Sequence, residues 1–234
     1  MSTMNQIMDK CWTEYRKLES QFKDIVDNYI PLIEKHKDVT SPRLAELSSI
    51  IGGWVETAWK RMEKSGYPPH CPTIDNIDTF REVFEQRYHL SKQRVRVLPN
   101  DYDIVKPFEE LSKSKNPKWF RTYSKHKHNR VMLQNLMTLD LVTRSLAGLF
   151  LLNVFPLEMR EYALKKGIIY SKWGKSKSYD TGSAMTETLL SHPHTLRGKY
   201  LSFVGHIMAE TSIFRFEFRR WMSKDDPKVY PSEL

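Results

Sequence analysis

Hydrophobic side chains recur at helical spacing through most of the first two thirds of the chain. Thr3 with Gln6 three positions later resembles a capping box, and Ser41 followed by Pro42 is a typical start of a second helix. After each start, apolar residues return every three or four positions, as one face of a helix requires. The pattern predicts helices over about 3–30, 41–62, 77–88, 116–130 and 138–153. We therefore expect a mainly α protein.

Other segments alternate with a period of two residues. Arg94–Val97 has this alternation, and Tyr102–Ile104 follows the turn residues Pro99 and Asn100, which predicts a small β-hairpin inserted between helices. Near the C-terminus, Ser212–Trp221 places Phe at every second position and is expected to be a half-buried strand. The other elements expected there are a helix to Gly167, a strand over Ile168–Trp173 that pairs with 212–221, and a helix over about Thr195–Glu210.

The length of 234 residues fits one main core with an appendage. Residues 1–155 form the predicted helical bundle, and 156–234 form a C-terminal α/β extension packed on it, unless the two are one continuous domain. The longest apolar stretch, Leu146–Phe155, has half the roughly 20 residues of a transmembrane helix, and residues 1–10 lack the apolar core of a signal peptide. Cys11 and Cys71, the two cysteines, do not suggest a secreted disulfide framework. We expect a cytoplasmic protein that does not enter membranes.

Cationic residues are concentrated in one segment. The chain has 37 Lys and Arg against 28 Asp and Glu, and its net charge of +9 favours a polyanionic partner or simply serves solubility. Lys118–Arg130, KWFRTYSKHKHNR, is the densest cationic stretch and also holds three aromatics, a combination suited to phosphate contacts and base stacking. The alternative is a solvated helix face whose aromatics lie in the core.

On a continuous helix, this segment would present its basic residues on two faces. Arg121, Lys125 and His128 are expected to share one face, whereas His126 is expected to pack under Trp119 and Tyr123. A His held among cations stays neutral and can act as a base, and an Arg beside it can stabilise charge on a phosphate. This pair is the minimum for RNA cleavage without a metal. A second His would come from a symmetric dimer.

Three segments together resemble a known group of proteins. Tyr123–Arg130, YSKHKHNR, resembles the YNxxKHxR helix of a widespread group of bacterial and archaeal proteins with HEPN-like helical bundles. Ser48–Lys60 resembles the upstream helix of the group, with Glu56 in the place of its acidic residue, and Thr138–Leu152 resembles its apolar helix. The resemblance covers about residues 5–155.

The resemblance implies a HEPN-like bundle that binds RNA, with metal-independent endoribonuclease activity in antiviral defence or stress toxicity. HEPN ribonucleases use Arg, four to six residues, then His, and both Arg121 with His126 and Arg121 with His128 satisfy this spacing. We expect Arg121 and His128 to be catalytic. The residues expected to support them are Glu56, Tyr123, Lys127, Asn129 and Arg130, and those expected to bind nucleic acid are Lys118, Lys125, His126, Arg215 and Arg219. The partners are RNA and a second copy of the chain, and no cofactor is expected.

Several alternatives stay open. The same basic helix would also serve a non-catalytic adaptor for nucleic acid or a partner protein, and a structural subunit is a weaker hypothesis. Around 214–220, alternating Phe and Arg suit a second nucleic-acid surface or, preferably, a core-facing aromatic row with solvated arginines. Metal-ligand types occur at His70, Cys71, His192 and His194 without zinc spacing, so no metal is expected. The pair Gly52-Gly53 within a predicted helix is expected to permit close helix packing.

Overall fold

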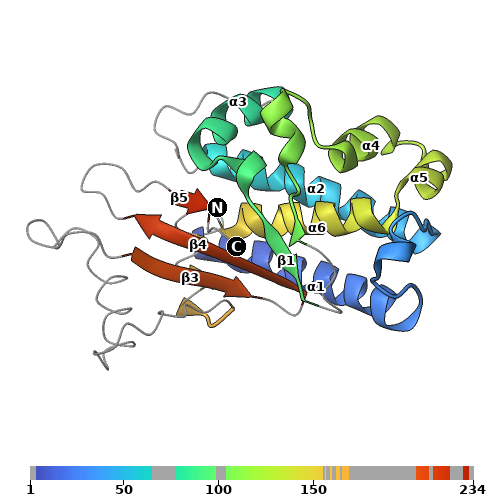
Figure 1. Ribbon diagram of the computed structural model, residues 1–234, viewed down its shortest axis with the longest axis horizontal. Helices are drawn as coiled ribbons and strands as arrows, with labels where there is room; N and C mark the ends of the chain where they lie inside the picture. The colour runs from blue at the N-terminus through green and yellow to red at the C-terminus, as the bar shows by residue number, and fades with distance from the viewer. Residues whose placement is uncertain are drawn as a thin grey trace, which may run out of the picture.

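The described part of this protein is mainly helical, with a small antiparallel sheet on one side (Figure 1). The structure is a computed structural model, and it describes residues 4–64, 77–98, 104–154, 204–210, 213–221 and 229–231, with 156, 159, 162, 163 and 165–168. The expected class of a mainly α protein is confirmed. His70, Cys71, His192 and His194 lie outside the described residues.

Six α-helices account for most of the described chain. They are α1 (Met4–Asn28), α2 (Pro42–Lys64), α3 (Ile77–Tyr88), α4 (Lys118–His126), α5 (Arg130–Leu136) and α6 (Leu139–Val154), with 3-10 turns η1 (Glu34–His36), η2 (Leu90–Lys92) and η4 (Glu109–Lys113). The Ser41 hydroxyl accepts a hydrogen bond from the backbone N–H of Leu44 at 3.2 Å, so Ser41 caps α2 as its position predicts.

The prediction of one helix over 116–130 is wrong at its C-terminal end. Helix α4 ends at His126, Lys127 and His128 form a turn, and α5 begins at Arg130. The side chain of Asn129 accepts a hydrogen bond from Met132 N at 3.2 Å and thereby caps α5. An Asn cap satisfies N–H groups that a continuous helix would pair internally, so the local chemistry favours a break.

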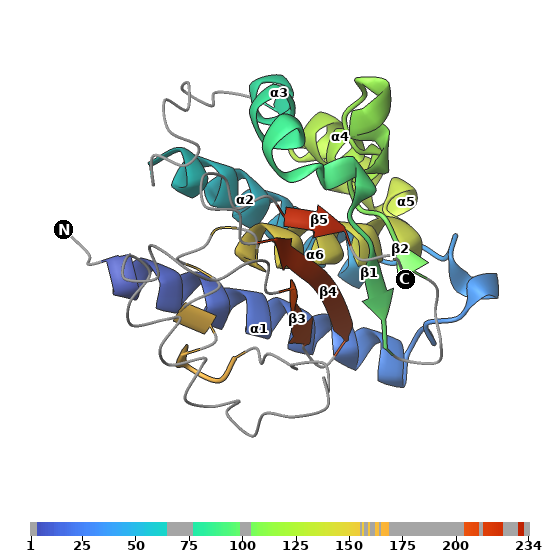
Figure 2. The same cartoon turned by 60° about the vertical axis from the view of Figure 1, so that its left-hand side comes forward.

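Helix α6 forms the centre of the core. It packs against α1, α2 and α4, and Figure 2 shows it between α1 and α2. Leu146 and Phe150 on this helix are fully buried, as are Phe22 of α1 and Ile51 of α2. The highly apolar sequence of α6 follows from this position, because a helix that neighbours cover on most sides keeps only a narrow polar face, here Asp140 and Arg144.

The sheet combines the predicted hairpin with the C-terminal strands. Its strands are β1 (Val95–Val97), β2 (Ile104–Val105), β3 (Val204–Glu210), β4 (Phe214–Trp221) and β5 (Val229–Pro231), in the order β2-β1-β4-β3 with β5 also pairing β4. Val95 pairs with Val105, which confirms the hairpin. All the pairings are antiparallel.

The C-terminal predictions are partly corrected. The expected helix over 195–210 is wrong for 204–210, because β3 pairs with β4 from Val204 opposite Trp221 to Glu210 opposite Arg215. Seven consecutive cross-strand pairs stabilise the extended conformation of this segment. The sequence of the segment alone does not reveal these pairs, because the partner residues lie in β4. The expected strand over 212–221 is confirmed as β4, with partners β1, β3 and β5. Its expected partner, 168–173, begins at Ile168, which lies in a bend; 169–173 are outside the described residues.

Several described residues after 155 share the core of the helices. Phe214 at the start of β4 is fully buried and stacks on Phe150 of α6, with ring centroids 6.1 Å apart. The backbone N–H of Ile213 donates to the buried carboxylate of Glu19 on α1 at 3.3 Å. Trp12 Nε1 donates to the carbonyl of Met159 at 3.3 Å. The hydrophobic cluster therefore runs from α1 through α6 to β4.

Candidate nucleic-acid interface

Helix α4 separates aromatic and cationic residues onto opposite faces. Its buried side chains are Trp119, Phe120 and Tyr123, and its exposed cations are Lys118, Arg121 and Lys125. Arg121 and Lys125 follow Lys118 by three and seven positions, so the three cations form one ridge along the helix. The predicted continuous face with His128 is not formed, because α4 ends two residues earlier. His126, the last residue of α4, is partly buried.

The aromatic face fixes the orientation of α4. Trp119 Nε1 donates to the carbonyl of Pro107 at 2.7 Å, and its ring meets Phe108 edge-on with centroids 5.9 Å apart. Trp119 also lies over Gly148 of α6, where an added Cβ would be 3.1 Å from the indole ring. A buried indole with its N–H satisfied tolerates little rotation, so the cationic ridge is held in one direction.

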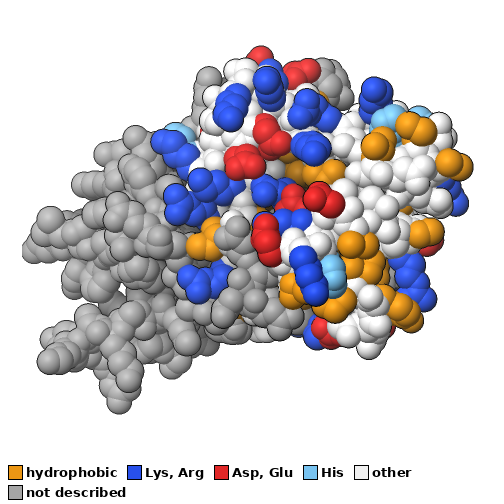
Figure 3. Space-filling view, turned by 45° about the vertical axis from the view of Figure 1, so that its right-hand side comes forward, with side chains coloured by type: hydrophobic (Ala, Val, Ile, Leu, Met, Phe, Trp, Pro, Cys, Tyr) orange, Lys and Arg blue, Asp and Glu red, His pale blue; other side chains and the backbone are white. Residues whose placement is uncertain are grey.

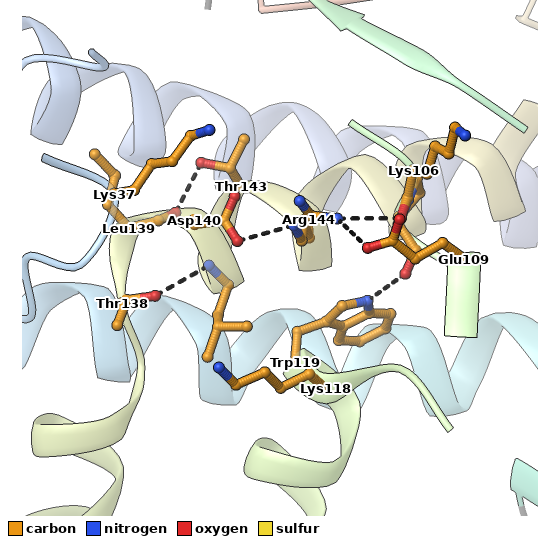
Figure 4. A network of polar contacts seen from close by, with 12 residues as sticks. Lys37, Lys106, Glu109, Lys118, Trp119, Thr138, Leu139, Asp140, Thr143 and Arg144 are labelled. Atoms are coloured by element: carbon orange, nitrogen blue, oxygen red, sulfur yellow. Dashed lines mark hydrogen bonds and ion pairs between the residues drawn. The ribbon is translucent and has the colours of Figure 1, made fainter. Parts of the chain in front are cut away.

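Arg144 of α6 secures the segment that leads into α4 (Figure 4). Its Nε donates to Asp140 at 2.8 Å, and one terminal nitrogen reaches Glu109 at 3.0 Å and the carbonyl of Lys106 at 3.4 Å. Lys106 precedes Pro107, whose carbonyl holds Trp119. Arg144 is thus committed to structural contacts inside the protein.

A second set of contacts joins the C-terminal half of α4 to α2. At Gly52, an added Cβ would lie 2.5 Å from the ring of Tyr123, so only glycine permits this approach; the expected close helix packing is confirmed there. Lys127 Nζ lies 3.4 Å from Glu56 Oε1 and 5.9 Å from the centroid of the Tyr123 ring. Glu56 therefore holds a cation of the predicted motif, and this cation is Lys127.

This environment changes the pKa of the Tyr123 side chain. Burial raises the pKa of the Tyr123 phenol to about 12, and the charge of Glu56 and a hydrogen bond with its carboxylate act in the same direction. Each cause disfavours the phenolate. Tyr123 is therefore neutral over the whole physiological pH range and acts here as a packed hydrogen-bonding group.

A pH prediction follows from the raised pKa of Tyr123. The unfolded chain ionises near the ordinary value of 10.0, while the folded protein keeps the phenol neutral up to about 12. The free energy of unfolding should therefore lose a contribution as the pH rises from 10 towards 12, and keep it below 10. Urea unfolding of wild type and Tyr123→Phe across this window measures it: the wild type should lose stability more steeply. Equal slopes would contradict the assignment.

The two residues expected to be catalytic are both exposed. Arg121 lies on the ridge of α4, and His128 lies in the turn between α4 and α5. Asn129, expected to support the site, caps α5, and Arg130 begins that helix with its side chain exposed. Arg121, His128, Asn129 and Arg130 thus lie around the break between α4 and α5. Because of this break, Arg121 and His128 do not share the single helix face that the sequence predicts.

The exposed basic residues of α4, of the turn after it and of the start of α5 form a cationic surface. We call Lys118, Arg121, Lys125, His128 and Arg130 the α4–α5 basic surface. Toward the upper right of Figure 3, cationic, histidine and hydrophobic side chains lie next to one another. Within the described residues no carboxylate forms an ion pair with Lys118, Arg121, Lys125 or Arg130, whereas Lys127 and Arg144 have such partners. These four charges are free to meet an external anion.

The second predicted surface, around 214–220, lies on β4, and the structure describes mainly the backbone of this strand. Phe214 is buried, as the preferred interpretation of a core-facing aromatic row expects for this position. Arg215 and Arg219 have defined register positions on β4, but their side chains are outside the described part.

Two further findings concern the described residues. None of their helices is long and apolar enough to cross a membrane. No three His, Cys, Asp or Glu side chains among them come together in a way that could hold a metal ion.

Comparisons with known proteins add no relative. Neither protein-family models, nor curated proteins, nor solved structures gave a match to this chain.

Proposed function

We propose that this protein binds RNA through the α4–α5 basic surface. The observation that supports this most is the set of exposed cations, Lys118, Arg121, Lys125 and Arg130, without ion pairs among the described residues. Lys118, Arg121 and Lys125 lie along one ridge of α4, where like charges repel each other in the free protein. A phosphate chain relieves this repulsion while releasing its own counterions. The YNxxKHxR-type motif and the mainly helical fold support a HEPN-like assignment.

The binding mode should be dominated by phosphate contacts. Trp119, Phe120 and Tyr123 are buried, so these aromatics offer no face for base stacking. Cations that meet phosphates carry no direct information on sequence. We therefore expect the affinity for RNA to depend strongly on salt concentration and weakly on RNA sequence.

A substitution of one ridge lysine tests this function. Lys125→Gln should weaken binding of a labelled RNA and lower the slope of log K against log salt by about one unit, because one phosphate contact is lost. Fluorescence anisotropy at several salt concentrations measures both. Lys17→Gln, which removes an exposed lysine of α1 paired with Glu14, is the matched control and should leave the slope unchanged. An equal slope in all three proteins would refute the proposal.

RNA cleavage is a second candidate function, favoured by the exposure of both Arg121 and His128. His128 would take the proton of the 2′-hydroxyl, the 2′-oxygen would attack the phosphorus, and the bond to the 5′-oxygen would break. Arg121 would stabilise the negative charge on the phosphate, and a second His, from another copy in a homodimer, would protonate the leaving 5′-oxygen. The products are a 2′,3′-cyclic phosphate and a 5′-hydroxyl. Under this hypothesis the protein acts in the cytoplasm, in defence or stress.

Cleavage is tested with EDTA present. Wild-type protein should convert a mixed labelled RNA pool to fragments with 2′,3′-cyclic ends, and His128→Ala should not. His36→Ala, in the turn η1 and outside the α4–α5 basic surface, serves as the control and should cleave like wild type. Intact RNA with all proteins, together with salt-dependent binding, would support the adaptor hypothesis, in which the same surface binds nucleic acid without catalysis.

A further inference from the structure

The short strand β1 also presents cations to solvent. Val95 and Val97 are buried, while Arg94 and Arg96, which alternate with them, are exposed. The buried positions face the helical core, because Val97 pairs with Phe214, which stacks on Phe150. Arg94 and Arg96 therefore belong to the opposite, outward face of the sheet.

The fold brings a second cationic segment next to Arg96. In the register of β1 and β4, Arg96 lies opposite Arg215, although 119 positions separate them in the sequence. Because faces alternate along a strand, Arg215 and Arg219 occupy positions on the same face as Arg96. Figures 1 and 2 show β1 and β4 side by side over α1 and α6.

This arrangement has an electrostatic cost. Like charges directly opposite each other on neighbouring strands are unfavourable, and Arg94 and Arg96 form no ion pair with any residue that the structure describes. Carboxylates do occur on this face: Glu210 is the β3 neighbour of Arg215, and Glu217 lies between Arg215 and Arg219 along β4. This face of the sheet therefore has two glutamate positions and four arginine positions, at 94, 96, 215 and 219. A phosphate between β1 and β4 would relieve the remaining repulsion.

We propose that the outward face of the sheet is a second phosphate-binding surface for RNA, with Arg96 opposite Arg215 as its centre. RNA as the ligand rests on the proposed function, but the residues are separate from the α4–α5 basic surface. RNA bound to both surfaces would extend from the end of the helical bundle onto the sheet. The sheet surface then contributes affinity for long RNA.

Arg96→Gln in the full chain tests this surface. With a labelled RNA of about 30 nucleotides, the variant should bind several-fold more weakly, and the slope of log K against log salt should fall by about one unit. Arg96→Lys should keep the slope, because a point charge suffices for one phosphate contact. Urea unfolding should show Arg96→Gln to be at least as stable as wild type, because the variant removes a repulsive pair.

Comparison with Lys125→Gln separates the two surfaces. If Lys125→Gln weakens binding and Arg96→Gln does not, the sheet surface is refuted and the α4–α5 basic surface stands. If Arg96→Gln alone weakens binding, the sheet surface stands and the α4–α5 surface falls. If neither substitution changes the salt slope, both proposals are refuted.

Discussion

Phe214→Ala should lower the free energy of unfolding by about 3–5 kcal/mol, the usual cost of removing a fully buried Phe. Phe214 is fully buried and its ring stacks on Phe150 at the centre of α6. The cost includes the lost apolar contacts and the cavity left between β4 and α6, which a backbone fixed by strand pairing cannot fill. Urea unfolding followed by circular dichroism measures it.

The same experiment tests whether the C-terminal strand and the helices unfold together. A shared core predicts one transition for helix and sheet signals in both wild type and Phe214→Ala. Val131→Ala on α5 is the control: Val131 is 67% exposed, and its loss should change stability by less than about 0.5 kcal/mol. A loss below about 1 kcal/mol for Phe214→Ala, or a separate early transition of the sheet, would show that β4 is not part of the cooperative core.

Gly52→Ala should lower the free energy of unfolding by about 2–3 kcal/mol, at the upper end of the usual cost of overpacking. The new Cβ would lie 2.5 Å from the Tyr123 ring, a distance that the ring or the whole of α4 must relieve by moving. Movement of Tyr123 would also disturb its contact with Glu56 and the ion pair of Glu56 with Lys127. Equilibrium urea unfolding gives the difference directly.

The neighbouring glycine provides the matched control for Gly52→Ala. An added Cβ at Gly53 has no atom within 4 Å, so Gly53→Ala should raise stability by about 0.5–1 kcal/mol through reduced backbone entropy in the unfolded chain. The two substitutions are chemically identical and adjacent on α2. Equal effects would show that Tyr123 does not pack closely on Gly52.

The sequence predicts the elements whose signals are local. The apolar stripes of α1, α2, α3 and α6 are each contained in one segment, and all four helices form where expected. The end of α4 was missed because Arg121, Lys125 and His128 continue the helical spacing. Asn129 was the signal that could have found the break, since Asn is a favoured cap.

The remaining features depend on residues far apart in the chain. β3 is a strand because β4 lies beside it, and Arg96 meets Arg215 only through the sheet register. Similarly, the resemblance places Glu56 among the supporting residues, and the packing of the helices pairs it with Lys127. The exposure of Arg121 and His128 is a precondition of their expected roles, which stay predictions.

The central place of β4 has a consequence for the order of events during synthesis. The helices α1 to α6 and the strand β1 leave the ribosome before Phe214 does. The surface of Phe150 and the edge of β1 therefore lack these partners for the time needed to make about sixty further residues. A nascent chain with an uncovered aromatic and an unpaired strand edge is exposed to aggregation. Arg96 on that strand and Arg94 just before it are cationic and would oppose such contacts between nascent chains until β4 arrives.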